Sequence, residues 1–225
     1  MERYRLLLFL SGIAFFFLFI LFSLVVAKGK LDQFDFNTTV RLQDNISRRS
    51  DDVFSVFSLI GNFEVMFIVL IILFVVLRKF IAGVIAIFLF GMFHIIELYG
   101  KNFVDHFPPP EFLLRTKRFL EFPQFHVRAE FSYPSGHSGR AVFLSVIIIV
   151  VVLLSKKIPP PLKIIIIGVI LAFDSTMLVS RIYLGEHWAT DVIGGALLGI
   201  SFGLFSSALM IRVNEGRGGI VRAKP

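Results

Sequence analysis

Long apolar runs separated by short polar connections are the dominant pattern of this sequence. A helix needs about 20 apolar residues to cross the ~30 Å of hydrocarbon in a bilayer. Six runs approach or exceed this length, namely Leu6–Ala27, Val53–Leu77, Phe80–Tyr99, Arg140–Ser155, Ile164–Ser180 and Val192–Ile211. The fourth run is the shortest, so we expect its helix to borrow residues from the turn before it. The pattern predicts an all-α integral membrane bundle of six transmembrane helices.

Two longer polar connections are expected to carry structure of their own. Between Lys28 and Asp52, apolar residues recur at loosely helical spacing, which predicts a short helix along the membrane interface; its first half could equally be a solvated loop. The connection Pro108–Tyr133 interleaves charged and aromatic residues, and we expect it to form a lid that rests on the interface. The run Leu6–Ala27 follows a basic start, as in a cleaved signal, but its length of 22 residues favours an uncleaved span.

The distribution of Lys and Arg predicts the orientation of the bundle. Basic residues are dense in the termini and short connections on one side, whereas on the other side they lie in two long loops that are also rich in acids. Density in short loops marks the cytoplasmic side. We therefore expect a protein of the cytoplasmic (inner) membrane with both termini in the cytoplasm and both long loops at the outer face.

Composition agrees with a membrane protein and excludes several other classes. The 225 residues are 56% hydrophobic with a mean hydropathy of +0.82, and they are expected to form a single domain, residues 1–225, with a mobile basic tail from about 213 to 225. The absence of cysteine excludes disulfides and thiolate metal sites. The net charge of +7 could suit nucleic acid, but no basic, aromatic-interleaved soluble segment exists to bind it, so contact with anionic lipid is expected instead.

One polar stretch, Ser180–Asp191, lies between the last two runs. His187 and Asp191 are four residues apart, which on a helix places them on one face and lets the carboxylate accept from one imidazole nitrogen. The other nitrogen is then available as a base or a nucleophile. Alternatively, the two residues only cap a helix and bond each other. Arg181 would be costly in hydrocarbon unless it faced water or a partner, so this cluster is expected at a membrane face.

A second polar stretch, Pro134–His137, opens the fourth run. Ser135 and Gly136 would lie at a helix N-terminus, where free backbone N–H groups and the helix dipole favour an anion. This position is suited to a phosphate group.

The two stretches together resemble the signature of the type 2 phosphatidic acid phosphatase superfamily, Pro-Ser-Gly-His followed by Ser-Arg-x5-His-x3-Asp, and both motifs are complete here. The resemblance implies that His187 attacks phosphorus and forms a phosphohistidine, with Asp191 holding its tautomer. It implies that His137 protonates the leaving group, and that no cofactor or metal is required. It further implies a set of phosphate ligands: Lys101, Ser135, Gly136 and Arg181.

The superfamily's first motif, Lys-x6-Arg-Pro, is incomplete in this chain. Counted from Lys101, the final proline matches, but Pro108 stands where the arginine belongs. The site is therefore one cation short unless another basic residue folds in. We favour Arg128, because it lies nearest in sequence to the Pro-Ser-Gly-His turn; the other candidates are Arg115, Lys117, Arg118 and His106.

Ionisable residues within the runs need partners. His94 and Glu97 could suggest metal ligands, but no third ligand lies nearby in sequence, and a Glu97–Lys101 pair at i,i+4 explains the charge more simply. His94 and Asp174 each precede a proposed phosphate ligand by seven residues. We expect these two to approach each other beneath the site; the alternative is that hydroxyls satisfy Asp174 while Glu97 satisfies His94.

The sequence thus predicts a membrane lipid phosphatase that acts on a lipid phosphate or diphosphate at the outer face. Candidate substrates are polyprenyl diphosphate, phosphatidylglycerol phosphate, phosphatidic acid and a lipid A type glycolipid. A phosphotransferase that passes the phosphoryl group to a lipid or sugar hydroxyl would use the same residues. The missing arginine also leaves a catalytically weak lipid-phosphate binder as an alternative. Vanadium haloperoxidases share the constellation, but they are soluble, and six spans argue against one.

Overall fold

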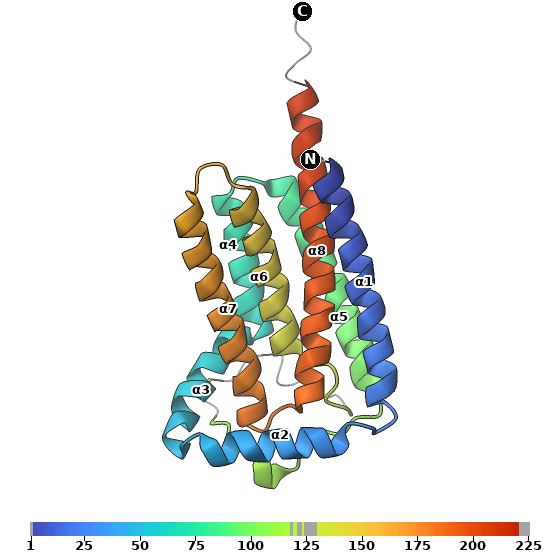
Figure 1. Ribbon diagram of the computed structural model, residues 1–225, viewed down its shortest axis with the longest axis vertical. Coiled ribbons are helices and arrows are strands. Elements are labelled where there is room, and N and C mark those ends of the chain that lie inside the picture. The colour runs from blue at the N-terminus through green and yellow to red at the C-terminus, as the bar shows by residue number, and fades with distance from the viewer. Residues whose placement is uncertain (1, 118, 121–122, 124–129, 221–225) are drawn as a thin grey trace, which may run out of the picture.

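The computed structural model describes the backbone of every residue except 1, 118, 121–122, 124–129 and 221–225, and side chains as far as residue 211 in the last helix. The described residues form helices and no strands. The start of α1 and the end of α8 lie at one end of the bundle, and α2 (Asp32–Asn45) lies across the other end (Figure 1). The bundle itself consists of α1 (Glu2–Val26), α4 (Phe63–Val76), α5 (Phe80–Phe103), α6 (Gly136–Leu154), α7 (Pro160–Tyr183) and α8 (Ala189–Ile220).

Five of the described helices are long and apolar enough to cross a membrane, and the number is six if a bent pair counts as one span. This bent pair includes the predicted span Val53–Leu77. The segments Arg48–Gly61 and Phe63–Val76 meet at 54°. The first segment contains α3 (Asp51–Ser58), which buries a polar face made of Asp51, Ser55 and Ser58. Because that face needs polar partners, α3 bends away from the direction of the apolar segment.

Helix α2 lies within the segment Lys28–Asp52, for which a short helix was predicted. Its buried residues are Asp35, Thr39 and Gln43, at a spacing of four that places them on one face. This polar face lies against the end of the bundle, with α7 and α8 beneath it.

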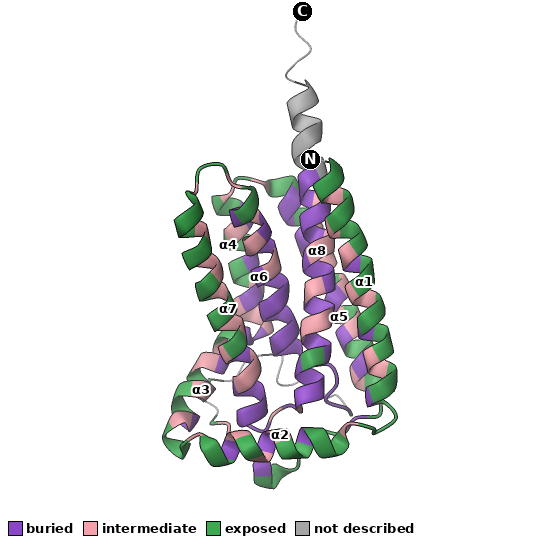
Figure 2. Ribbon diagram, in the orientation of Figure 1, coloured by how far each residue is buried: buried purple, intermediate pink, exposed green. Residues whose placement is uncertain are grey.

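The core of the bundle lies between α6 and α8, which are largely buried, whereas α1 and α7 expose apolar faces (Figure 2). Small residues let the two central helices approach closely. A Cβ atom on Gly195 would collide with the carbonyl oxygen of Ser135, and one on Gly199 with that of Gly139. Helix α6 begins at Gly136, so it does borrow residues of the Pro-Ser-Gly-His turn. Helix α8 runs to Ile220 and takes in the first residues of the expected tail.

Candidate active site

His187 and Asp191 lie at the junction of α7 and α8. Gly185 adopts φ 68° in this turn, a conformation that glycine reaches without steric cost, and it lets the chain reverse before His187. Nδ1 of His187 lies 3.3 Å from Oδ2 of Asp191, and the backbone N–H of Trp188 donates to the same oxygen at 3.0 Å. The predicted pair is therefore present, and the Nε2 edge of the imidazole faces away from the carboxylate.

The electrostatic surroundings of His187 favour its neutral form. Burial lowers the pKa of His187, and the positive charges of Arg181 and Lys101 lower it too. The hydrogen bond to Asp191 opposes these effects without cancelling them. The resulting pKa lies below the ordinary histidine value, so the imidazole carries a free lone pair at neutral pH.

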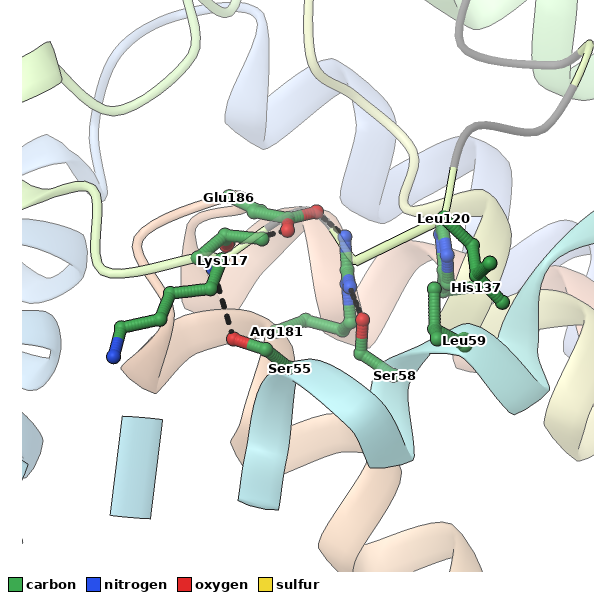
Figure 3. A pocket seen from close by; sticks show the side chains of 9 residues that line it. Ser55, Ser58, Leu59, Lys117, Leu120, His137, Arg181 and Glu186 are labelled. Carbon is green, nitrogen blue, oxygen red and sulfur yellow. Dashed lines mark hydrogen bonds and ion pairs between the residues drawn. The ribbon is translucent and has the colours of Figure 1, made fainter. Parts of the chain in front are cut away.

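Arg181 is fully buried near the end of α7, and its guanidinium points into a cavity that His137 also lines (Figure 3). One terminal nitrogen donates to Oγ of Ser58 at 2.7 Å, and the other pairs with the carboxylate of Glu186. The Nε of Arg181 has no hydrogen-bond partner among the described atoms. Glu186 also accepts from the hydroxyl of Thr116 at 2.5 Å. A protein carboxylate thus occupies an anion position at this guanidinium.

His137 lies in the first turn of α6, with both ring nitrogens engaged. Nε2 lies 2.7 Å from Oδ1 of Asn62, which the bend between α3 and α4 brings to the site. Nδ1 lies 3.3 Å from a guanidinium nitrogen of Arg140. Arg140 donates to the carbonyl of Gly61 at 2.9 Å and to Glu97 at 3.4 Å. Because a guanidinium only donates, Nδ1 of His137 accepts here and the ring proton is on Nε2.

Lys101 lies in the last turn of α5, near both histidines. Its Nζ lies 3.3 Å from Glu97, which confirms the predicted i,i+4 pair. Lys101 and Arg181 are both close enough to His137 and His187 to act on their charges. Cations and histidines that are far apart in sequence therefore form one cluster at the end of the bundle covered by α2.

Ser135 and Gly136 lie at the start of α6, as predicted. Ser135 is fully buried; its backbone N–H donates to the carbonyl of Asp191 at 2.9 Å, and its Oγ accepts from Ser138 at 3.1 Å. The first of these bonds ties the two motifs together. A Cβ atom on Gly136 would collide with the carboxylate of Glu97, so glycine is required there. Phosphate binding by these two residues stays a prediction.

The basic residues proposed to replace the missing arginine lie in different surroundings. Arg128, the favoured one, and Arg118 lie outside the described residues. Arg115 lies over a tyrosine ring at 5.1 Å, and Lys117 pairs with Asp52 at 2.6 Å in an exposed position. The buried cation that contacts His137 is instead Arg140. Its signal in the sequence was an arginine inside an apolar run, three residues after a motif histidine.

The expected contact between His94 and Asp174 is wrong. Nδ1 of His94 lies 2.9 Å from Glu97, and Asp174 accepts from the hydroxyl of Ser145 at 2.8 Å. Ser145 belongs to α6, which packs against α7 and supplies the hydroxyl that Asp174 needs. The two ionisable residues thus have separate partners, as the alternative held, and Nε2 of His94 is buried without a hydrogen-bond partner among the described atoms.

The comparisons with known proteins decide the family. The family model of the PAP2 superfamily matches residues 69–215, which include both complete motifs. This chain belongs to the PAP2 superfamily. Among proteins of curated function, no sequence matches it.

Two solved structures have the same fold. One is the first transmembrane PAP2 type phosphatidylglycerolphosphate phosphatase from Bacillus subtilis, at 18% identity and a TM-score of 0.69, covering 91% of this chain and 96% of that one. The other is LpxE from Aquifex aeolicus, at 24% identity and a TM-score of 0.54, covering 77% of this chain and 94% of that one. The all-α membrane fold predicted from the sequence is confirmed.

Sequence reasoning missed three residues that contact the PAP2 motifs. Asp35 accepts from both the backbone and the side chain of Thr190, while Ser58 and Asn62 bond motif residues from the α3–α4 region. All three precede the part of the chain that the family model matches. Their signal was weak, because single polar residues in α2 and α3 are also expected of any interfacial segment.

Proposed function

We propose that this PAP2 protein is a membrane lipid phosphatase that hydrolyses the terminal phosphate of a lipid phosphate or diphosphate through a phosphohistidine on His187. The observation that carries the proposal is the cluster of His187 and His137 with Arg181 and Lys101 at one end of the bundle. The Bacillus subtilis neighbour is named as a phosphatidylglycerolphosphate phosphatase, which supports a lipid phosphate as the substrate class.

In the first step, Nε2 of His187 attacks the phosphorus. Its lone pair forms the N–P bond, and the P–O bond to the leaving group breaks with its electron pair on the leaving oxygen. His137 is neutral in the structure, so it first takes up a proton on Nδ1 in place of the Arg140 contact. The imidazolium then gives that oxygen a proton. Arg181 and Lys101 stabilise the negative charge that builds on the phosphoryl oxygens, and burial of the site strengthens this stabilisation.

In the second step, water attacks the phosphoryl group on the side opposite His187. The P–N bond breaks and returns its electron pair to Nε2, while the now neutral His137 takes a proton from the water. Inorganic phosphate is released. We propose that the cations and the start of α6 supply the electrostatic stabilisation.

The proposed location is the outer face of a cytoplasmic membrane. The start of α1 and the end of α8 lie at the end of the bundle opposite α2 and the site (Figure 1). The short connections at that end carry Arg78, Lys79, Lys156 and Lys157. By the positive-inside rule, this end faces the cytoplasm and the site faces outward.

The test is release of inorganic phosphate by the purified protein in detergent, with a chelator present. The panel comprises polyprenyl diphosphate, phosphatidylglycerol phosphate, phosphatidic acid and a lipid A type phosphate. We expect release from at least one, its loss in His187→Ala, and full activity in Ser175→Ala, which alters an exposed residue of α7. Transfer of phosphate to an added alcohol in place of water would indicate a phosphotransferase. Saturable binding without turnover would indicate a binding protein, and either result contradicts the proposal.

A further inference from the structure

His106 lies in the segment that follows α5, two residues before the position of the missing arginine. Its side chain is buried, and its carbonyl accepts from both the backbone N–H and the hydroxyl of Ser132, at 2.9 and 3.0 Å. The ring also meets the ring of Tyr133 edge-on, with centroids 6.5 Å apart. The position of His106 is therefore fixed through its backbone as well as its ring.

Both ring nitrogens of His106 face carboxylates. Nδ1 lies 2.7 Å from Oδ1 of Asp191 on α8, and Nε2 lies 3.5 Å from Oδ2 of Asp35 on α2. An ionised carboxylate only accepts hydrogen bonds, so an imidazole between two of them donates from both nitrogens and carries a positive charge. Burial lowers the pKa of His106, but the bonds to Asp191 and Asp35 outweigh it and raise the pKa to about 9.

The positive charge of His106 compensates the buried carboxylates of Asp35 and Asp191. Asp35 and Asp191 are at most 1% exposed. Apart from His106, Asp35 bonds the backbone and hydroxyl of Thr190, and Asp191 bonds His187 and a backbone N–H. Since buried carboxylates are costly without a compensating charge, the imidazolium of His106 stabilises both.

The bonds of Asp191 are divided between its two oxygens. His106 binds Oδ1, whereas His187 and the N–H of Trp188 bind Oδ2. The contact to His187 is the longest of the three, at 3.3 Å. Without His106, Oδ1 would be buried and unpaired, and the carboxylate could rotate away from His187.

We propose that His106 is a protonated positioning residue that links Asp35 to Asp191 and so holds Asp191 in the orientation that aligns His187. The proposal rests on the proposed role of His187 as nucleophile. The first-motif segment of this chain therefore carries a cation that faces the carboxylate behind the nucleophile, where the family pattern has an arginine that faces phosphate.

The kinetic test uses His106→Gln, with Asp105→Asn as the matched control because Asp105 is the exposed neighbour in the same segment. Misalignment by about 1 Å can cost 10²-fold in rate, so we expect kcat to fall about 10- to 100-fold, with KM little changed, in His106→Gln alone. Wild-type activity should also decline as the pH rises through about 9, because the imidazolium is then lost. His106→Gln should lack that decline.

Chemical rescue separates positioning from a merely structural role. His106 lines a cavity shared with Asp32, Asp35 and Asp105, so imidazole can enter when the side chain is removed. We expect added imidazole to restore kcat in His106→Gly but not in His187→Ala. Wild-type kcat in His106→Gln, or an unchanged alkaline decline, would overturn the proposal.

A readout without turnover keeps this test independent of the proposed function. Trp188 is the single tryptophan, and its indole N–H donates to the carbonyl of Phe107, next to His106. Its fluorescence should change with a midpoint near pH 9 in the wild type and not in His106→Gln. A change that persists in His106→Gln overturns the proposal, whether or not the protein hydrolyses any lipid.

The other described groups around His106 do not account for a transition near pH 9. They are Asp32 and Asp35 from α2, Asp105 in its own segment, Asp191 from α8, His187 beyond Asp191, and Tyr133. Among these residue types, only His and Tyr titrate above pH 6 in ordinary peptides. Burial raises the pKa of Tyr133 and lowers that of His187, which moves both away from pH 9.

Discussion

Replacing Glu97 by alanine is expected to destabilise the protein severely. The carboxylate is 5% exposed and contacts three side chains, His94 at 2.9 Å, Lys101 at 3.3 Å and Arg140 at 3.4 Å. Arg140 is equally buried; it also donates to the carbonyl of Gly61 and toward His137, and the carboxylate of Glu64 lies near enough to act on its charge. Glu97→Ala therefore removes the carboxylate that contacts a buried guanidinium.

The expected magnitude follows from this burial. Two unit charges about 4 Å apart attract by about 4 kcal/mol at an effective dielectric constant of ~20. Breaking a buried ion pair by removing one partner costs about 3–5 kcal/mol. We therefore expect Glu97→Ala to lower the free energy of unfolding by about 3–5 kcal/mol, which is a factor of at least about 10² in the unfolding equilibrium constant.

The assay is denaturation in mixed detergent micelles, followed through the fluorescence of Trp188. The matched control is Asp52→Ala, which removes a carboxylate whose contact with Lys117 is shorter, at 2.6 Å, but whose side chain is 58% exposed. Because exposed ion pairs are solvated and screened, the control should leave the midpoint nearly unchanged. Equal shifts in the two variants, or a larger shift in Asp52→Ala, would refute the argument from burial.

Three further predictions concern the active site. Because burial lowers the pKa of His187 and its neutral form is the nucleophile, the loss of kcat/KM on the acid side should begin only below pH 6.5; an acid limb above that value would contradict the assignment. Gly195→Ala should cost about 1–3 kcal/mol and most of the activity by displacing the Pro-Ser-Gly-His turn, whereas Gly168→Ala, which meets nothing within 4 Å, should be neutral in the same denaturation and activity assays. Glu186→Gln should lower the KM for a lipid phosphate, since the carboxylate competes with phosphate for Arg181; a higher KM would show that it assists binding.

The membrane-spanning helices and the contact between His187 and Asp191 could be predicted because both depend on residues that are close in sequence. Apolar runs fix the spans irrespective of their neighbours. The four-residue spacing of His187 and Asp191 predicted their contact on one helix face, and the contact is present although His187 lies in the turn before α8. The break at Gly61–Asn62 could not be predicted in this way. It depends on the polar face of α3 finding partners in segments more than fifty residues away, such as Arg181 at Ser58.

The contacts that complete the site depend on tertiary packing. His106 was a candidate for the missing phosphate cation. Instead it bonds Oδ1 of Asp191, whereas His187 bonds Oδ2. Whether a basic side chain faces phosphate or a carboxylate is decided by the helix that packs against it, here α2 with Asp35. The sequence of the segment itself contains no such information.

The most direct test of the central claim is labelling of the protein by a lipid phosphate that carries radioactive phosphorus. The account predicts an acid-labile, alkali-stable phosphoryl label on His187 after rapid quenching. The label should be absent in His187→Ala. In His137→Ala it should form more slowly, because His137 also protonates the leaving group, and it should then persist, because its hydrolysis needs His137 as base. Labelling that survives in His187→Ala, or an acid-stable ester on another residue, would contradict the account.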